Sequence, residues 1–472
     1  MRDRVAGMED LSRYKYKALV ITGLGTFMGT LDASIVNVSL PTISRDFGTT
    51  VGVVGWVVLS YALAVFPLLM IFGAMSEKKG FQFSYRYGYL IFLVGSVLCG
   101  LATGIYMLII SRVIQGIGAA LLVSVGPALV SRSFPAEERG RGLSIIAIVV
   151  SAGLMLGPPL GGFIIGLAGW RWIFFVNVPV CFLGYYFTIR YISDFPITDP
   201  EKKVSFPGGL TLSPGMFLLM LSLLLFSRGV FGLYTVLALL GVSGLLFGLF
   251  FYFESKPETR LIGLDIFKNR VFTFSGAAML LVFISLISVT ILMPFYLEQV
   301  RGKSPQEVGL FLMIIPLCGF FVAPLAGYLA DRFQARLISS IGVALIAAGI
   351  LLIRQLEAAS SVTDIIVALI VIGIGMALFS TPNTSSIMGS VSKMQLGSAA
   401  GILVTIRTLG ITLGVGFSIS IFSFYRDRYP GAGVSEFSAF IYAYRTVYEI
   451  MLYIVVLGIV FSLVRGRNLN SR

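Results

Sequence analysis

Long apolar runs separated by short polar connectors recur along the whole chain. A helix needs about 20 predominantly apolar residues to cross a bilayer. Runs of this character predict an all-α membrane protein with fourteen spanning helices, near residues 18–41, 52–75, 86–105, 106–130, 143–167, 172–191, 210–227, 231–253, 271–297, 307–330, 337–353, 363–388, 397–423 and 443–464. The first run follows a basic segment and is too long for a signal-peptide core, so we expect an uncleaved span there.

Composition supports this prediction and narrows the possible functions. Hydrophobic residues make up 57% of the 472 residues and charged residues 12%, whereas soluble domains carry about 25% charged residues. The net charge of +13 is spread over short connectors, which favours a basic membrane protein over a nucleic-acid-binding one. Histidine is absent, and Cys99, Cys181 and Cys318 are isolated in apolar runs. We therefore expect neither a metal site nor a catalytic centre.

The distribution of basic residues predicts the orientation of the chain. An even number of spans places both termini on one side, and the connectors on that side carry 24 of the 35 Lys and Arg residues, against 9 on the other side. The positive-inside rule therefore places both termini in the cytoplasm. We expect a multi-pass protein of the cell membrane, plasma or inner.

Two connectors far apart in the chain resemble each other. "GAMSEKKG" closes the second span and "GYLADRFQ" closes the tenth, so that Gly73 and Gly327 stand 254 residues apart. The other matched pairs are Glu77 with Asp331, Lys78 with Arg332, and Pro41 with Pro294. Matching position at two landmarks favours a true duplication over chance resemblance of short connectors.

The offset of eight spans between these connectors equals a six-span unit plus one inserted pair. We therefore expect a six-helix bundle at residues 1–205, two inserted central helices at 206–254 and a second six-helix bundle at 255–472. Internal repeats of this kind mark secondary transporters, whose substrate site lies between the halves near the midplane.

Two opposite charges lie at similar depth inside spans. Asp32 lies nine residues before the outer end of the first span and Arg112 about seven residues into the fourth, which places them ~13 Å and ~10 Å deep. A charge inside a span is a functional hypothesis by default. We interpret Asp32 as a proton-carrying residue tuned by Arg112; the alternative is a structural ion pair between the two spans. Asn37 falls roughly 140° around the helix from Asp32 and is interpreted as a packing or gating residue.

Other polar residues of the last two spans are candidates for substrate binding or gating. Arg407 lies ~15 Å deep, where it could bind an anionic group or only backbone carbonyls. Glu449 follows Arg445 by four residues, so it forms either an i,i+4 pair at a wet helix end or a second proton or cation site. Tyr448, one of four tyrosines in its span, could stack on a cationic substrate.

The fifth span contains "GLMLGPPLGG", in which glycines and prolines interrupt the apolar run. Such residues kink a helix and let a neighbouring backbone approach closely. We expect a hinge or seal between the two halves, with simple tight packing as the alternative. The residues concerned are Gly153, Gly157, Pro158, Gly161 and Gly162.

Together these segments resemble the major facilitator superfamily, in particular its fourteen-span drug:proton antiporter branch. "LDASIVNVSLP" is similar to the first-helix motif of that branch, and "RVIQGIGAA", which holds Arg112 and Gln115, is similar to its fourth-helix motif. "GLMLGPPLGG" resembles the antiporter motif of the fifth helix, and "GWRWIFFVNVP" and "STPNTSSIMGSV" also fit the branch. The resemblance covers nearly the whole chain.

The resemblance implies two six-helix bundles that flank helices 7 and 8, with alternating access between the bundles. It also implies that Asp32 couples to protons with the assistance of Arg112, and it adds Gln115 to the candidates for substrate binding or gating.

One family motif departs from its usual form. In the loop after the second span, Glu77 stands where the family has aspartate, and Phe81 and Gln82 replace a basic pair, whereas the second copy keeps Asp331 and Arg332. This departure predicts a weaker or rewired cytoplasmic latch in the N-terminal half.

The sequence therefore predicts a secondary active transporter, not an enzyme, that exports hydrophobic, cationic drugs or toxic compounds in exchange for protons. One alternative is the export of a lipid or an anionic metabolite, because Arg112 and Arg407 could hold an anion. Another is a non-transporting sensor or assembly factor, which the lack of a sizeable soluble domain disfavours. We expect no cofactor and no nucleic acid; the partners are the bilayer, protons and a small-molecule substrate, with a monomer as the functional unit.

Overall fold

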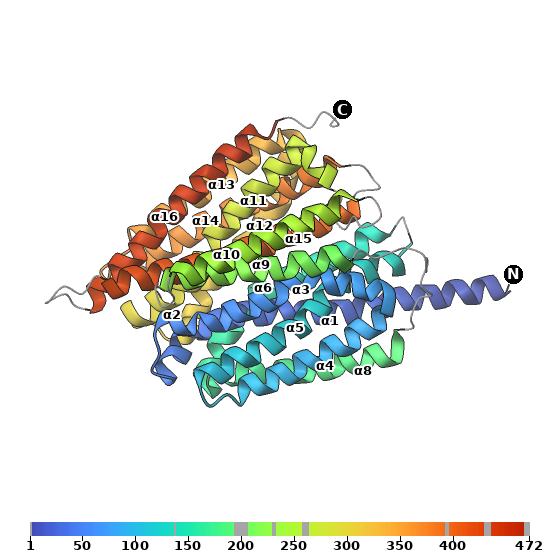
Figure 1. Ribbon diagram of the computed structural model, residues 1–472, viewed down its shortest axis with the longest axis horizontal. Helices are drawn as coiled ribbons and strands as arrows, with labels where there is room; N and C mark the ends of the chain where they lie inside the picture. The colour runs from blue at the N-terminus through green and yellow to red at the C-terminus, as the bar shows by residue number, and fades with distance from the viewer. Residues whose placement is uncertain are drawn as a thin grey trace.

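The computed structural model describes residues 2–135, 138–192, 206–228, 233–256, 264–391, 396–428 and 436–466, and the regular structure in these ranges is helical (Figure 1). The elements are α1 (Arg2–Asp46), α2 (Val51–Val54), α3 (Trp56–Lys79), α4 (Phe81–Gly100), α5 (Ile105–Ser133), α6 (Arg139–Ala168), α7 (Trp172–Phe175), α8 (Asn177–Tyr191), α9 (Phe206–Arg228), α10 (Leu233–Ser255), the 3₁₀ helix η2 (Leu264–Lys268), α11 (Arg270–Phe295), the π-helical turn η3 (Tyr296–Val300), α12 (Pro305–Arg332), α13 (Ala335–Arg354), α14 (Val362–Gly389), α15 (Leu396–Arg428) and α16 (Glu436–Val464). Helices prevail because a bilayer offers no water, so each backbone N–H and C=O must be satisfied within its own segment.

Local signals in the sequence set several helix ends. α12 and α14 begin with a capping box, in which a serine side chain accepts a hydrogen bond from the backbone three residues on and an acidic side chain returns the contact. The pairs are Ser304 with Glu307 and Ser361 with Asp364. α6 ends just before Gly169, whose φ of 90° lies in the region that favours glycine.

The predicted spans can be compared with the helices one by one. Fourteen helices of 15 or more residues lie in the described ranges, and each predicted span falls on one of them. Eleven of these helices are long and apolar enough to cross a membrane; α3, α4 and α9 do not reach that criterion over their described residues. The all-α membrane fold is therefore confirmed, and the number of fourteen spans exceeds the eleven that length and hydropathy support.

The helices pack in two sets whose contacts follow the same pattern. In the first set, α1 packs on α6, α3 and α4 pack on α5, and α4 packs on α8. In the second set, α11 packs on α15, α12 and α13 pack on α14, and α13 packs on α16. Figure 1 shows the first set in blue to blue-green and the second in yellow-green to red. This correspondence supports the predicted duplication, and the division of the chain at residues 205 and 254 stays a prediction.

A close helix crossing recurs at equivalent places in the two sets. A Cβ atom added to Gly118 on α5 would lie 2.9 Å from the carbonyl oxygen of Gly88 on α4. A Cβ atom added to Gly375 on α14 would lie 2.7 Å from the carbonyl oxygen of Gly342 on α13. Small residues let helix backbones approach closely in a membrane, so the two sets share this crossing.

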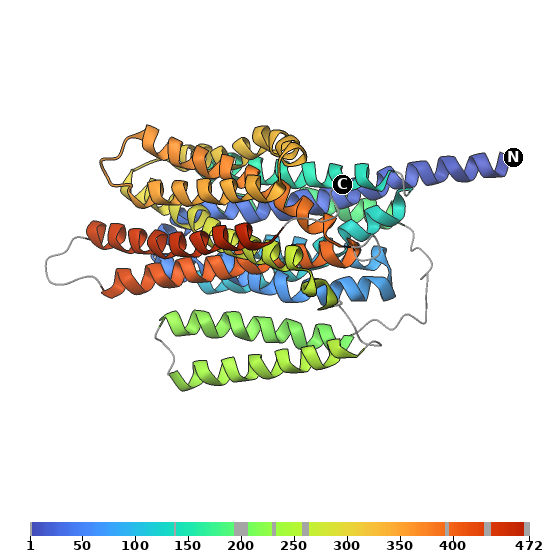
Figure 2. The ribbon, with the colours of Figure 1, turned by 90° about the horizontal axis from the view of Figure 1, so that it is seen from above.

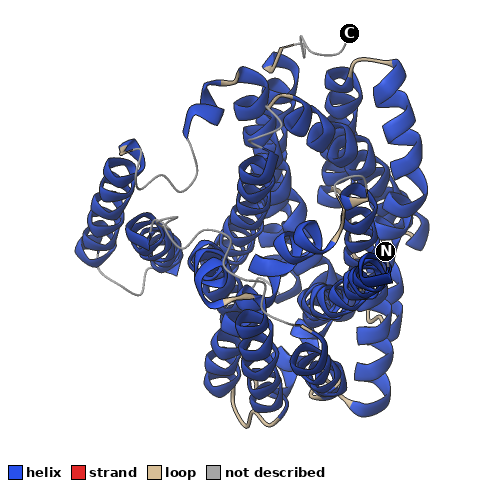
Figure 3. Cartoon of the chain, turned by 90° about the vertical axis from the view of Figure 1, so that its right-hand side faces the viewer, coloured by secondary structure: helices blue, strands red, loops and turns tan. Residues whose placement is uncertain are grey.

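α9 and α10 form a pair beside the two sets. The hydroxyl of Ser243 on α10 donates a hydrogen bond to the carbonyl oxygen of Gly215 on α9, at 2.8 Å. α9 also contacts α3 of the first set and α15 of the second. Figure 2 shows this green pair lying apart from the other helices, and Figure 3 shows the same separation from the end that carries the N terminus. The pair occupies the place in the chain of the two predicted inserted helices.

The two sets meet closely near one face of the molecule. The start of α1 lies on the right in Figure 1 and α16 rises from the lower left toward the top, so both termini lie on the upper-right side, here called the terminal face; the other end of the helices forms the opposite face. Near the opposite face, Gly162 of α6 lies against the carbonyl of Pro305 on α12, and Gly309 of α12 lies against the carbonyl of Pro158 on α6. The helices of the two sets diverge toward the terminal face in Figure 1, so the structure is closed at the opposite face.

Candidate functional site

Asp32 lies at the centre of a buried polar cluster in the first helix set. Its side chain, on α1, has no exposed surface. Its Oδ2 accepts a hydrogen bond from Nη1 of Arg112 on α5 at 2.6 Å. Its Oδ1 accepts one from Nε2 of Gln115 at 2.9 Å and one from Nδ2 of Asn177, the first residue of α8, at 2.8 Å. Asp32 and Arg112, which the sequence places at similar depth, therefore form a direct ion pair.

Arg112 has three further contacts that do not depend on Asp32. Its Nε donates to the carbonyl oxygen of Val57 on α3 at 2.9 Å, and its Nη1 donates to Oε1 of Gln115 at 2.5 Å. The guanidinium carbon lies 4.1 Å from the ring centroid of Tyr61 on α3, a cation–π distance. The buried cation therefore has neutral partners on α3 and α5 in addition to the carboxylate.

The geometry divides the two oxygens of Asp32 between different partners. Oδ1 is held by the neutral amides of Gln115 and Asn177, whereas Oδ2 faces the cation of Arg112. The second amide hydrogen of Gln115 goes to the hydroxyl of Ser96 on α4, at 2.9 Å, which fixes the amide's orientation. A proton on Oδ2 would therefore remove the ion pair with Arg112 and leave the carboxyl group anchored through Oδ1 to Gln115 and Asn177.

The second helix set has the same helix crossing without these charges. When the two halves are aligned at Pro41 and Pro294, Asp32 corresponds to Ser285. When they are aligned at Gly118 and Gly375, Arg112 corresponds to Leu369 and Gln115 to Ile372. The contacts agree, because Gly95 lies against Gln115 and Gly349 lies against Ile372.

The side chains at these three counterparts are an alcohol and two aliphatic groups, and all three are fully buried. A buried ion pair can often be replaced by packed apolar residues without loss of stability. The second set thus keeps the same helix crossing without an ion pair at these positions.

The glycines of "GLMLGPPLGG" form two contact surfaces on α6. Cβ atoms added to Gly153, Gly157 or Gly161 would collide with Thr30, Ser34 and Ile35 of α1, respectively. Gly162 and Pro158 instead lie against α12 of the other set. The motif therefore packs α6 tightly on the helix that carries Asp32 and also forms part of the contact between the two sets. Its role as a hinge or seal stays a prediction.

The two matched connectors lie at equivalent helix ends. Gly73 lies in the last turns of α3 and Gly327 in the last turns of α12. The guanidinium of Arg332 lies 4.7 Å from the ring centroid of Tyr328. The side chains of Glu77 and Asp331 lie outside the described part of the structure, so their roles in a latch stay predictions.

Arg407 lies on α15, far along the chain from the Asp32 cluster. Its side chain is half-buried, and its guanidinium carbon lies 5.2 Å from the ring centroid of Phe283 on α11. Within the described ranges, no carboxylate pairs with it. It is therefore an uncompensated cation on a helix of the second set.

The predicted pair of Arg445 and Glu449 is wrong. Glu449 accepts a hydrogen bond from Arg354 of α13 at 3.0 Å, and Arg445 pairs with Glu357 at 2.7 Å. Both contacts reach the neighbouring helix or its connector because the long arginine side chains bridge between helices at the opposite face. Tyr448 is fully buried, and its hydroxyl donates to the carbonyl oxygen of Ser288 at 3.3 Å.

Other residues of the site have weaker signals in the sequence. Asn177 lies in the quoted segment "GWRWIFFVNVP", but nothing in the sequence alone shows that it meets Asp32. Ser96 and Tyr61 lie on apolar helices without any motif. Asn37 is buried and its Nδ2 donates to the carbonyl oxygen of Ala33 at 3.1 Å, away from the Asp32 cluster.

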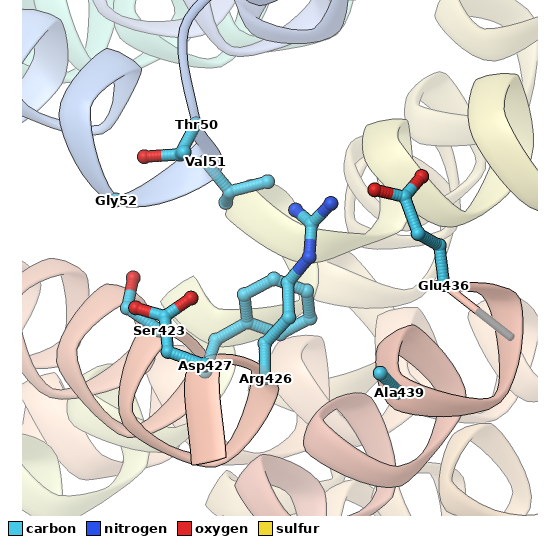
Figure 4. Close-up of a pocket in the computed structure, with 9 residues that line it drawn as sticks. Thr50, Val51, Gly52, Ser423, Arg426, Asp427, Glu436 and Ala439 are labelled. Carbon is cyan, nitrogen blue, oxygen red and sulfur yellow. The ribbon is translucent and has the colours of Figure 1, made fainter. Parts of the chain in front are cut away.

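A pocket of about 390 Å³ lies at the opposite face between the two sets, not at the Asp32 cluster. It is lined by Thr50, Val51 and Gly52 of the first set and by Phe422, Ser423, Arg426, Asp427, Glu436 and Ala439 of the second. Figure 4 shows the guanidinium of Arg426 pointing toward Val51 and the carboxylate of Glu436 standing on the other side of the space. Because both sets line the pocket, its shape depends on their relative position.

Comparison with known protein sequences identifies related membrane transporters. The family model of the Major Facilitator Superfamily matches residues 22–415. The chain is 33% identical over 454 residues to the riboflavin transporter RibZ of Clostridioides difficile, covering 95% of this chain and 97% of that protein. It is 31% identical over 405 residues to the multidrug resistance protein Stp of Mycobacterium tuberculosis, covering 86% of this chain and 75% of that protein.

A solved structure adds support for the fold. A bacterial homolog of the human lysosomal transporter Spinster, in an inward-facing and unoccupied conformation, matches with a TM-score of 0.69 at 17% identity, over 97% of this chain and 98% of that one. The chain belongs to the Major Facilitator Superfamily. It is a multi-pass membrane transporter of small molecules, and members of this family are generally not enzymes.

Proposed function

We propose that this transporter exports hydrophobic organic compounds, cationic ones among them, in exchange for protons, with Asp32 as the proton-carrying residue and both termini in the cytoplasm. The observation that carries the proposal is the buried Asp32–Arg112 pair, which has an apolar counterpart in the second helix set. Because the second helix set has the same fold without this ion pair, we interpret the pair as functional, with Asp32 gaining and losing a proton during transport. The similarity to a multidrug resistance protein supports the proposal.

The contacts of Asp32 suggest how a proton would be coupled to movement. An ionised Asp32 holds Arg112 through Oδ2 and thereby adds a charged contact between α1 and α5 to the neutral one made by Gln115. A protonated Asp32 would release Arg112 to the Val57 carbonyl, Gln115 and the face of Tyr61. The two protonation states therefore favour different arrangements of the helices, which is the difference in interaction energy that a coupled conformational change requires. Since Asp32 is fully buried in the present conformation, a movement of the two sets must bring it to water.

Arg407 favours a second candidate function, the export of an aromatic or anionic compound. Its guanidinium is half-buried beside Phe283 and pairs with no carboxylate in the described ranges. A guanidinium beside an aromatic ring can bind a planar or anionic group through charge and stacking. One similar protein is named as a riboflavin transporter, and riboflavin is a planar aromatic compound.

Inverted membrane vesicles test the proposed function. The vesicles are acidified inside, and lipophilic cations, neutral aromatic compounds, riboflavin and organic anions are added one at a time. We expect lipophilic cations to dissipate the pH gradient and accumulate inside, with no effect in vesicles that lack the protein. Strict preference for riboflavin or anions would favour the second candidate, and flux that ignores the pH gradient would contradict proton exchange.

Arg407 variants separate the two candidates. Arg407→Gln removes the charge, whereas Arg407→Lys keeps it without the planar fork. If Arg407 binds the substrate's anionic or planar group, transport of those compounds falls in Arg407→Gln and stays partly active in Arg407→Lys, while transport of cations is unchanged. Equal loss for every compound would assign Arg407 to the fold instead.

A further inference from the structure

Glu298 forms an ion pair that joins the two helix sets at the opposite face. Its carboxylate, at the end of α11 in the π-helical turn η3, accepts a hydrogen bond from Nη2 of Arg45 on α1 at 2.7 Å. The Glu298 side chain is 2% exposed, whereas that of Arg45 is 71% exposed. An acidic residue at a helix end is usually solvated, whereas here the two halves close over the carboxylate.

The two partners occupy equivalent positions in the duplicated chain. Pro41 matches Pro294 at an offset of 253 residues, and the same offset takes Arg45 to Glu298. A contact between equivalent positions lies on the approximate twofold axis that relates the two sets. Identical charges there would repel, whereas arginine in one copy and glutamate in the other attract. The pair therefore stands where the two sets must separate if the opposite face opens.

One oxygen of Glu298 is weakly held. Oε1 is buried and makes no hydrogen bond of standard geometry, and the hydroxyl of Thr42 on α1, which lies close enough to interact with the carboxylate, is also buried. A buried polar atom without a partner carries a desolvation cost, which is greater for a charged group. A weakly held, buried carboxylate oxygen at the contact between the sets is a place where a proton can bind.

We infer that Glu298 is a second proton-binding site and that its ion pair with Arg45 is the latch of the opposite face. The inference rests on the proposed function, in which the opposite face is the outer one. With Glu298 ionised, Arg45 holds the sets together and the face stays closed. A proton from the outside medium converts the carboxylate to a neutral carboxylic acid, which removes the attraction and allows the face to open.

Other charged groups near this turn are already engaged in the described structure. Asp46 on α1 accepts from Trp170 and Arg171, and Lys303 pairs with Glu307 at the start of α12. Arg301, after the turn, donates to the carbonyl oxygen of Ala358. Arg45 is thus the charged side chain that faces Glu298 from the elements described around it, and the latch depends on one titrating group.

The opening of the latch can be measured by the reactivity of an engineered cysteine placed in the buried contact between the two sets. Ile419 on α15 is buried against Gly55 at the start of α3, across the contact between the sets. In a Cys318→Ser background, Ile419→Cys is treated with a membrane-impermeant thiol reagent from outside, at values from about pH 8 to about pH 5. Each rate is divided by that of Ala359→Cys, an exposed connector residue, because thiol reactivity itself changes with pH.

We expect the normalised labelling of Ile419→Cys to rise several-fold as the outside pH falls. Adding Glu298→Gln or Arg45→Gln should give fast labelling at every pH, whereas Glu307→Gln, at a partly exposed acid on the same face, should keep the pH dependence of the parent. Slow labelling in both latch variants would contradict the role of the Arg45–Glu298 pair as a latch. A labelling rate of the parent that does not change with pH would contradict proton binding by Glu298. The assay needs no substrate, so its failure is distinct from a failure of proton-coupled export.

Discussion

Asp32 and Arg112 are the residues for which sequence and structure agree most closely. Counting residues from the span ends placed them at similar depth, and the structure brings them to 2.6 Å. The same counting could not predict the contact of Asn177 with Asp32, because that contact depends on where α8 begins and on which of its faces packs against α1. Glu298 was missed for a related reason. Burial at a helix end is decided by the opposing half of the molecule, which local sequence does not describe.

The second helix set provides a design for testing the ion pair at the residue scale. Arg112→Leu alone leaves the Asp32 carboxylate buried without its cation, and we expect a loss of about 3–5 kcal/mol in stability. The triple variant Asp32→Ser, Arg112→Leu, Gln115→Ile copies the residues of the second set. It should recover most of this stability, measured as Tm in detergent, and still lack proton-coupled transport. A triple variant as unstable as Arg112→Leu would show that the pair is needed by the fold.

At the scale of helices, glycine positions decide how closely neighbours pack. The sequence pattern predicted a glycine-rich contact on α6, and its period of four residues is compatible with one helix face against α1. The identity of the second neighbour could not be predicted, because Gly162 meets Pro305 only when the two sets are closed at the opposite face. The wrong pairing of Glu449 has the same origin, since long arginine side chains reach across helices rather than along them.

The contact of α6 with α12 predicts a variant that shifts the conformation. A valine at Gly309 collides with the carbonyl oxygen of Pro158, which is backbone and cannot move aside. This overpacking costs about 1–3 kcal/mol, and the cost falls on the conformation that is closed at the opposite face. We expect Gly309→Val to speed the labelling of Ile419→Cys.

Two glycines serve as controls for this variant. Gly319→Val on the same helix meets open space and should have no effect. Gly118→Val disrupts a crossing within one set, so it should lower Tm without favouring either face. Equal labelling rates for Gly309→Val and Gly319→Val would contradict the assignment of this contact to the closed state.

At the scale of the whole molecule, the duplicated pattern of spans was readable from the sequence, whereas the conformation was not. Apolar runs and matched connectors specify which helices exist and which are equivalent. Which face is closed depends on a small energy difference between two packings of the same helices, and no sequence period reports it. The contacts of Gly162, Gly309 and Glu298 identify the closed face directly.

The excess of basic residues on one side predicts the orientation of the whole molecule. In a Cys318→Ser background, Ala359→Cys should react with an impermeant thiol reagent in intact cells. Gln334→Cys, in the exposed connector between α12 and α13, should react only after the cells are opened. The reverse pattern would place both termini outside the cytoplasm and would invert the proposed direction of transport.

The central claim is that Asp32 carries the transported proton, and one pair of variants tests it directly. Asp32→Asn keeps the shape of the side chain and cannot ionise, and Asp46→Asn makes the same change at the end of the same helix. In inverted vesicles with an imposed pH gradient, substrate-induced proton movement should fall to the level of empty vesicles for Asp32→Asn and persist for Asp46→Asn, with equal amounts of folded protein. Proton-coupled transport by Asp32→Asn at the rate of the unchanged protein would contradict the claim.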